Sequence, residues 1–327
     1  MPHRAWSSMK EKAVASAPGK VILFGEHFVV SGYPAIVTAI DMRARAVLTP
    51  SHDKFKIKSG QSWAAWNAEG EQIYPPPPQP TPFQPLFNMV LKIMEDHGVS
   101  ACFNAEILSE IPGAAGLGSS AAVSVSLAKA VAAFNNIDMS LESVIHYSML
   151  AEKEYHGRPS GIDSHITALG GTLVYNGPRK CQQLQLNKHP SIFIAYTGLR
   201  RKTSKMVSYV QNFAAEKPDE FGQLSEIYSE IFRRAVNALK SNDLCSLGRL
   251  MTINHFLLRC LGLSNEKVER AVEKLLEKGA YGVKITGAGG GGCVIAVGDH
   301  ELFENVSGFF PGFWKSSTGC KGVDVEA

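Results

Sequence analysis

Apolar residues recur at intervals of three and four in several long segments of the chain, and this spacing predicts amphipathic helices. The predicted helices span 85–97, 140–155, 221–239, 244–261 and 267–276, and the chain is mostly helical from residue 204. Shorter apolar or alternating runs predict strands at 103–107, 171–175, 183–186, 192–196, 282–286, 293–297 and 322–326. The pattern therefore predicts a mixed α and β protein whose composition shifts near residue 200.

The N-terminal segment is predicted to form a sheet, because short runs rich in Val, Ile and Ala alternate with polar turns. Its strands span 13–16, 21–24, 35–40, 43–49 and 55–57, the last as an edge strand. Lys20 lies in the turn between the first two strands, so it is either a solvent-exposed turn residue or a charge directed into a site. Glu26 and His27 follow the second strand and place an acid beside an imidazole.

A glycine-rich segment, IPGAAGLGSS at 111–120, leads directly into a run rich in Ala and Val that predicts a buried helix. Unpaired N–H groups and the helix dipole make such a helix start a binding site for anions, most often phosphate. The alternative is that Ser119 and Ser120 merely cap the helix. A Walker A loop is excluded, because the segment lacks the lysine of that motif.

A second glycine-rich run, 287–292, joins two predicted strands. A dinucleotide-binding fingerprint is excluded here, because that motif opens a helix. The run instead predicts a hairpin whose glycines let another loop approach closely. The proline-rich segment 74–82 is predicted to be extended. It is either a polyproline ligand for another protein or, as we favour, a stiff connection into the next helix.

The composition limits the class of protein. The 327 residues, 45% hydrophobic and 19% charged, fit one large or two modest domains. A net charge of +3 without a long basic stripe argues against a nucleic-acid partner. No segment has the length and apolarity of a signal peptide or membrane span, so we expect no membrane partner. The six widely spaced cysteines are expected to be reduced and buried in a cytoplasmic protein.

Three separated segments together resemble the signature motifs of the GHMP small-molecule kinases. They are APGKVILFGEH at 17–27, PGAAGLGSSAA at 112–122 and KITGAGGGG at 284–292. The first motif, the segment HGRPSGIDSHITALGGTLVY at 156–175 and Asn254-His255 are most similar to family members that act on mevalonate rather than galactose. The resemblance covers nearly the whole chain.

The resemblance implies an α+β fold with two domains after a flexible leader at 1–12. Residues 13–180 would form a ribosomal-protein-S5-like, ATP-binding domain with a left-handed βαβ crossover. Residues 181–327 would form a ferredoxin-like α/β domain that completes the substrate cleft. The implied activity is ATP- and Mg²⁺-dependent phosphorylation of the C5 hydroxyl of (R)-mevalonate in isoprenoid synthesis. The oligomeric state is left open, with a homodimer among the alternatives.

The resemblance also implies roles for individual residues. Asp163 matches the acid that takes or orients the hydroxyl proton, and Lys20 matches the lysine near the transferred phosphoryl group. Ser120 and Glu152 match the Mg²⁺ ligands. The implied triphosphate cradle consists of Pro112, Gly113, Ala114, Ala115, Gly116, Leu117, Gly118, Ser119 and Ser120. The implied substrate side includes Glu26, His27, Thr203, Ser204, Gly287 and Ala288.

These residue types suit phosphoryl transfer, which needs positioned N–H groups, a divalent ion, a lysine and a carboxylate near the attacking hydroxyl. One position departs from the family pattern. Ala114 stands where the first of three glycines is expected, and its methyl group either crowds the nucleotide or requires an unusual backbone angle. From the residues alone, Asp163 is also compatible with an ordinary helix cap or turn.

Three alternative functions remain open from the sequence. A GHMP kinase for another alcohol or for a phosphorylated mevalonate would use additional basic residues, for which Arg158 and 200–202 are candidates. A catalytically silent ligand-binding protein would be expected to lack Lys20 or Asp163, and both are present. The related ATP-dependent decarboxylase fits the segment 156–164 less well.

Overall fold

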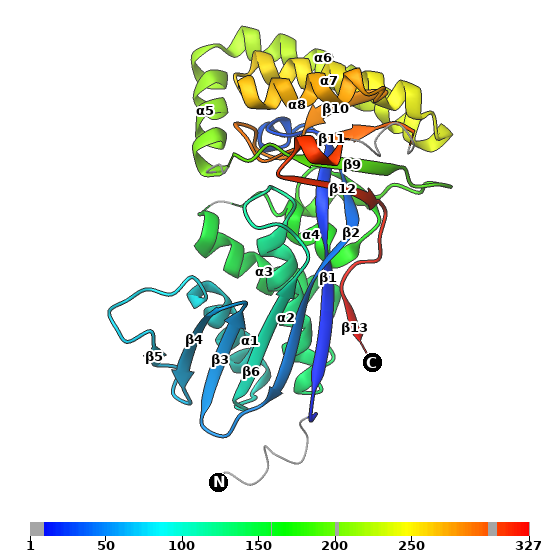
Figure 1. The fold of residues 1–327 in the computed structure, drawn as a ribbon. Helices are drawn as coiled ribbons and strands as arrows, with labels where there is room; N and C mark the ends of the chain where they lie inside the picture. Colours follow the sequence, from blue (N-terminus) through cyan, green and yellow to red (C-terminus); the bar gives the residue numbers. More distant parts are fainter. Residues whose placement is uncertain (1–9, 158, 200–202, 300–305, 327) are drawn as a thin grey trace.

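The computed structural model describes residues 10–157, 159–199, 203–299 and 306–326, and they build two sheets, each covered by helices (Figure 1). The larger sheet and its helices form the lower body in Figure 1, and the smaller sheet with its layer of helices forms the upper body. Strands β1 (Ala13–Phe24) and β2 (Ala35–Pro50) are long and extend up to the smaller sheet. They therefore connect the two bodies.

The larger sheet has the strand order β13-β1-β2-β6-β3-β4-β5, and β7 and β8 extend it from β2. Its remaining strands are β3 (Lys54–Ser59), β4 (Ser62–Asn67), β5 (Gln72–Tyr74), β6 (Phe103–Ser109), β7 (Thr172–Tyr175), β8 (Cys181–Gln183) and β13 (Asp324–Glu326). β3 lies between β6 and β4, so the prediction of an edge strand at 55–57 is wrong. Neither β4 nor β5 was predicted from the sequence, and β5 has only three residues.

β1 is one continuous strand, which corrects the prediction of two strands separated by a turn at 17–20. The Pro18-Gly19 pair produces a shift in the pairing with β2 between Pro18 and Lys20, not a break. Such a bulge inserts a residue and redirects the neighbouring side chains. Lys20 consequently lies in the interior of a strand and is almost fully buried, so it is not a solvent-exposed turn residue.

Four helices cover the larger sheet: α1 (Gln84–His97), α2 (Ser119–Phe134), α3 (Leu141–His156) and α4 (Ile162–Leu169). The predicted helices at 85–97 and 140–155 are confirmed by α1 and α3. α2 contacts β1, β2 and α3, and its Ala- and Val-rich sequence allows the chain to pack closely on several sides. The eight-residue α4 was not predicted, because it is too short for a clear helical period.

The smaller sheet has the order β10-β11-β9-β12, with β9 (Ser191–Tyr196), β10 (Gly282–Ile285), β11 (Cys293–Val297) and β12 (Gly312–Ser317). Its helices are α5 (Thr203–Glu216), α6 (Pro218–Ser241), α7 (Leu244–Cys260) and α8 (Glu266–Glu277). The last three confirm the helices predicted from periodicity. β12 was not predicted from the sequence.

The glycine run 287–292 connects β10 and β11, which pair as an antiparallel hairpin. The amide of Gly290 donates to the Leu263 carbonyl at 2.7 Å, and the amide of Gly292 donates to the Leu199 carbonyl at 2.9 Å. A Cβ atom at Gly289 or Gly291 would lie 2.8 Å from the neighbouring leucine Cβ. The prediction that another loop approaches these glycines closely is confirmed.

The C-terminal tail returns to the larger sheet, where β13 pairs with β1. Arg43 on β2 secures this return. Its guanidinium donates to the carbonyls of Lys321 and Gly322 at 2.9 and 2.8 Å and to the backbone and side chain of Ser16. The tail therefore joins the last strand of the upper body to the first strand of the lower one.

The proline-rich segment is a loop that leads from β5 into α1. The Gln72 amide donates to the carbonyls of Pro75 and Gln79, and the Tyr155 hydroxyl donates to the Pro82 carbonyl at 2.9 Å. These bonds fix the loop to β5 and α3, as expected for a stiff connection.

Two further expectations concern the cysteines and the membrane. None of the six cysteines forms a disulfide, but Cys245 and Cys260 are exposed, so the expectation that all are buried is wrong. Across the described ranges, no helix combines the length and apolarity needed to span a membrane.

The crossing of α7 over β10 gives a test of the fold. A Cβ atom at Gly248 would lie 2.4 Å from the Tyr281 carbonyl carbon, so we predict that Gly248→Ala separates the helix from the strand and lowers Tm by several degrees. Gly222→Ala on α6 is the control, because its added methyl meets nothing within 4 Å and alanine favours a helix. An equal Tm for both variants would contradict the close crossing.

Candidate active site

Lys20 and Asp163 form an ion pair that joins the larger sheet to α4. The Lys20 Nζ lies 3.0 Å from the Asp163 Oδ1 atom. The lysine side chain is 5% exposed, whereas the aspartate side chain is 32% exposed, so the carboxylate remains accessible from solvent. Asp163 belongs to the first turn of α4, where the positive end of the helix dipole favours a carboxylate. The helix-start interpretation of Asp163 and its site interpretation are therefore compatible.

The glycine loop lies directly against Lys20. The Lys20 amide donates to the Leu117 carbonyl at 2.9 Å, and Leu117 is buried in the core shared with β1. Gly118 takes the left-handed conformation with φ of 77° and is the N-cap of α2. Ser119 and Ser120 are therefore the first helical residues, and the alternative that they merely cap the helix is wrong. Their position at the start of α2 gives the geometry of an anion site.

Ala114 has φ of 59°, which lies in the left-handed region that glycine adopts most easily. The residue is exposed, so its methyl group meets solvent rather than the protein core. Of the two consequences considered for an alanine at this position, the structure therefore shows the unusual backbone angle. Holding alanine there costs roughly 1 kcal/mol.

Glu152 is the buried acid of the site. It lies in the last part of α3 and is 4% exposed, and its Oε1 atom has no hydrogen-bond partner among the described residues. Burial, with a smaller contribution from the charge of Asp163, raises the pKa of Glu152 to about 7. The Ser120 hydroxyl and the Lys20 ammonium act in the opposite direction. Glu152, Ser120, Asp163 and Lys20 thus interact with one another.

This set of oxygen donors fits a magnesium ion. Mg²⁺ prefers hard oxygen ligands and usually takes only one or two carboxylates, the rest being water and substrate phosphates. A buried carboxylate oxygen without a partner, close to a serine hydroxyl at an anion-binding helix start, meets that requirement. Within the described ranges, no three His, Cys, Asp or Glu side chains cluster as an all-protein metal site.

His27 and Glu26 lie where the first motif meets the smaller sheet. His27 is buried, has φ of 63°, and its Nε2 atom lies 2.9 Å from the Ala288 carbonyl oxygen. Glu26 is 1% exposed and forms a buried ion pair with Lys284 on β10. Gly287 and Ala288, predicted for the substrate side, are therefore adjacent to His27. The sequence analysis did not single out Lys284, although a lysine within an apolar strand next to a glycine motif is an unusual signal.

The side chains of Thr203 and Ser204 lie outside the described part of the chain, although both residues belong to the backbone of α5. The basic residues Arg158 and 200–202 also lie outside it. Their contribution to the substrate side stays a prediction.

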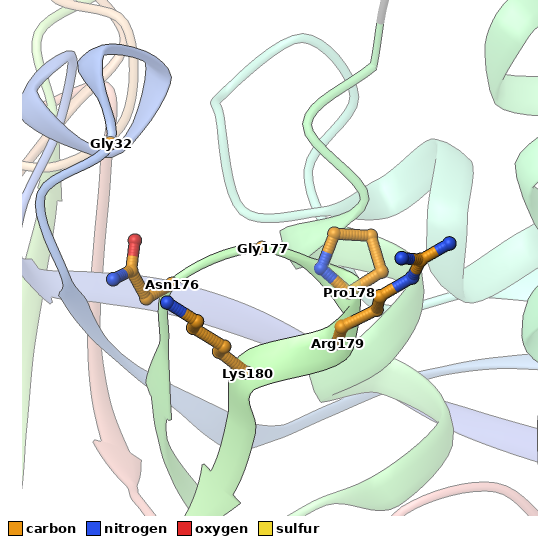
Figure 2. Close-up of a pocket in the computed structure, with 6 residues that line it drawn as sticks. All are labelled: Gly32, Asn176, Gly177, Pro178, Arg179 and Lys180. Atoms are coloured by element: carbon orange, nitrogen blue, oxygen red, sulfur yellow. The ribbon is translucent and has the colours of Figure 1, made fainter.

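A separate cavity of about 530 Å³ lies at the turn between β7 and β8. Figure 2 shows Arg179 and Lys180 on this turn, with Gly32 from the segment after His27 at the other side. None of the residues that line the cavity is a predicted site residue, so this cavity is not part of the candidate active site around Lys20 and Asp163.

Gly118 offers a test of the contact between the loop and Lys20. A Cβ atom there would lie 2.8 Å from the Lys20 Cγ atom, in a backbone conformation that alanine disfavours. We predict that Gly118→Ala lowers Tm by several degrees in the ligand-free protein. Gly113→Ala, in the same loop but with nothing within 4 Å of the added methyl, should keep the wild-type Tm.

Glu152 offers a test by pH. Its folded pKa of about 7 exceeds its ordinary value of 4.5, so the folded state binds the proton more tightly and loses stability as the pH rises through this window. The wild type should therefore lose roughly 2 to 3 kcal/mol more than Glu152→Gln between pH 5 and 8 in urea unfolding without Mg²⁺. Glu154→Gln, an exposed position on the same helix, should follow the wild type. Parallel pH profiles for wild type and Glu152→Gln would contradict the buried carboxyl.

Family models match three parts of the chain. GHMP kinases N terminal domain matches residues 85–171, and GHMP kinases C terminal matches residues 235–315. Galactokinase galactose-binding signature matches residues 6–50, the segment that contains the first motif. The three matches follow the order of the motifs in the sequence.

Several relatives are similar to the chain over most of its length. Mevalonate kinase of Pyrococcus furiosus is 34% identical and covers 90% of this chain and 91% of its own. Mevalonate kinase of Archaeoglobus fulgidus is also 34% identical, over 87% of this chain and 92% of its own. Both coverages span the two bodies of the fold.

Solved structures agree with this similarity. Mevalonate kinase of Methanococcus jannaschii has a TM-score of 0.82 at 26% identity, covering 95% of this chain and 99% of its own. Galactokinase of Lactococcus lactis in complex with galactose shares the fold, with a TM-score of 0.76 at 18% identity over 98% of this chain and 96% of its own. The expected two-domain fold is confirmed. This chain belongs to the GHMP kinase family, and within it is most similar to the mevalonate kinases.

Proposed function

We propose that this kinase transfers the γ-phosphoryl group of ATP to the C5 hydroxyl of (R)-mevalonate, with Mg²⁺ as the metal. The observation that carries the proposal is the Lys20–Asp163 ion pair, at 3.0 Å, beside the anion-binding start of α2. The mevalonate kinases that are about a third identical to the chain support the choice of substrate. The product would enter isoprenoid synthesis, in the cytoplasm.

Asp163 is the proposed residue that orients the attacking hydroxyl and takes its proton. An alcohol is a poor nucleophile at neutral pH, and a carboxylate within hydrogen-bond reach assists its attack. Lys20 engages the Oδ1 atom of Asp163, and the partial exposure of the aspartate leaves it accessible to a substrate. The buried ammonium also lies close to the start of α2, where it stabilises negative charge that develops on the transferred group.

The segment 112–120 is the proposed cradle for the nucleotide phosphates. Its backbone N–H groups and the dipole of α2 neutralise phosphate charge without reorganisation during the reaction. Ser120 and Glu152 are the proposed protein ligands of Mg²⁺. When bound, the ion neutralises charge on the transferring phosphate oxygens.

The substrate side is proposed to lie at His27, Gly287 and Ala288, with Thr203 and Ser204 from the start of α5. The buried hydrogen bond between His27 and Ala288 joins the lower body to the upper one at this point. We further propose that the two domains follow the division into 13–180 and 181–327, except that β8 and β13 from the second range pair in the larger sheet. The nucleotide phosphates would then bind at segment 112–120, and the alcohol would bind at His27, Gly287 and Ala288.

The test is ADP release by the purified protein with ATP, Mg²⁺ and, in turn, (R)-mevalonate, 5-phosphomevalonate, galactose and homoserine. We predict turnover with mevalonate alone. Asp163→Asn should lower kcat by at least about 10²-fold and leave the affinity for ATP nearly unchanged, because the carboxylate acts on the hydroxyl and not on the nucleotide.

The outcomes of this assay separate the alternatives. Turnover with another alcohol but not with mevalonate would refute the substrate, and turnover with 5-phosphomevalonate would favour the kinase for a phosphorylated substrate. ATP binding without turnover of any alcohol would favour a silent ligand-binding protein. A near-normal kcat in Asp163→Asn would remove that residue from its proposed role.

A further inference from the structure

Alternate residues of β10 and the loop after it contact the first motif. Lys284 reaches Glu26, the Thr286 hydroxyl lies 3.0 Å from the Ile22 amide and 3.1 Å from the Ile22 carbonyl oxygen, and the Ala288 carbonyl contacts His27. Lys284 lies in β10 and Thr286 and Ala288 lie in the loop after it, so these successive contacts form one continuous seam between the two bodies.

The ammonium of Lys284 is wholly surrounded by protein acceptors. It donates to the carboxylate of Glu26, to the Ile285 carbonyl at 2.6 Å and to the Ile22 carbonyl at 3.5 Å. An ammonium has three protons, so these three acceptors match its donor capacity. The side chain is completely buried. Lys284 is therefore not placed to bind a phosphate or a carboxylate from solvent.

Glu26 is equally enclosed. Its side chain has no exposed surface, its Oε1 atom accepts from Lys284, and its Oε2 atom is buried without a hydrogen-bond partner among the described residues. Burial raises the pKa of Glu26 and lowers the pKa of Lys284, while the attraction between them opposes both shifts. Because the cost of desolvation offsets much of that attraction, such a pair contributes little net stability compared with apolar side chains of the same size. Its contribution is geometric.

The geometry that the pair fixes is the turn that carries His27. The amides of Phe28 and Val29 donate to the carbonyls of Glu26 and Gly25, so the backbone folds back tightly around Glu26. His27 itself is held at a positive φ, which is costly for a residue with a side chain. A strained residue needs support from its neighbours, and the ion pair anchors the residue directly before it.

We propose that Glu26 and Lys284 are positioning residues for the acceptor alcohol: their buried ion pair holds the strained His27 turn against β10, and neither residue contacts the substrate. The proposal rests on the proposed function of the same site. It assigns the substrate contact to His27 and gives Glu26 an indirect role.

The test compares Glu26→Gln, Lys284→Met and the double variant that carries both changes. Glu26→Gln leaves the buried ammonium of Lys284 without a counter-charge, and Lys284→Met leaves the buried carboxylate of Glu26 without a partner, so each single variant should lose stability. The double variant buries neither charge and should recover part of the wild-type Tm, although its introduced amide lacks the ammonium partner. If the pair also positions His27, the double variant should keep a KM for mevalonate raised about tenfold or more, with the KM for ATP within about twofold of wild type.

Thr286→Val is the matched control for general weakening of the seam. It removes the hydrogen bonds to Ile22 but leaves the Glu26–Lys284 pair, so it should lower Tm without changing the KM for mevalonate. A wild-type KM for mevalonate in the double variant would overturn the proposal. A raised KM in Thr286→Val equal to that of the double variant would also overturn it, because any weakening of the seam would then suffice.

A second measurement does not depend on the substrate. Hydrogen exchange at the amides of Phe28 and Val29 should be faster in the double variant than in wild type, since their hydrogen bonds belong to the turn that the pair holds. Unchanged exchange would refute the positioning role whatever the acceptor is. Failure of wild type to phosphorylate mevalonate would refute only the proposed function, and the KM comparison would then use the accepted alcohol from the panel.

Discussion

The position of Lys20 in β1 is the constraint on which the rest of the site depends. Its amide is bonded to the glycine loop, its ammonium is paired with α4, and the strand around it is paired with β2. A buried lysine is tolerated only when it is paired, so Asp163 and Lys20 each fix the other. The absence of a side chain at Gly118 provides the space that the lysine stem occupies. The anion loop, the buried acid of α3 and α4 are therefore arranged around one strand position.

The sequence predicted the parts of the fold that have a strong period. Long helices with a regular apolar face were predicted with ends within a few residues of the observed ones; these are α1, α6, α7 and α8. β1 was divided wrongly, because Pro18 and Gly19 normally interrupt a strand, whereas here the pairing with β2 continues on both sides of them and accommodates them as a bulge. α4 and β12 were missed, because neither has a pattern that differs from a loop.

The site shows the same limit in a different way. Lys20, Glu152, Asp163 and Ser120 were identified through motifs, and the structure brings them together from three helices and one strand. Their separate positions in the sequence contain no information on distance. Lys284 lies in the third glycine-rich motif and was not predicted as a site residue. Its partner Glu26 was predicted to face the substrate. Burial, which the sequence does not encode locally, distinguishes the two roles.

The return of the C-terminal tail has a consequence for the order of assembly. Because β13 completes the edge of the larger sheet beside β1, β1 lacks one neighbour until β13, which follows the other strands of that sheet in the sequence, has docked. Contacts of such high sequence separation form late and slow the folding of a chain. Arg43 on β2 donates two hydrogen bonds to the tail, at Lys321 and Gly322, and two to Ser16 on β1, so it links the docked tail to both strands. The larger sheet is therefore expected to gain its full stability only when β13 docks.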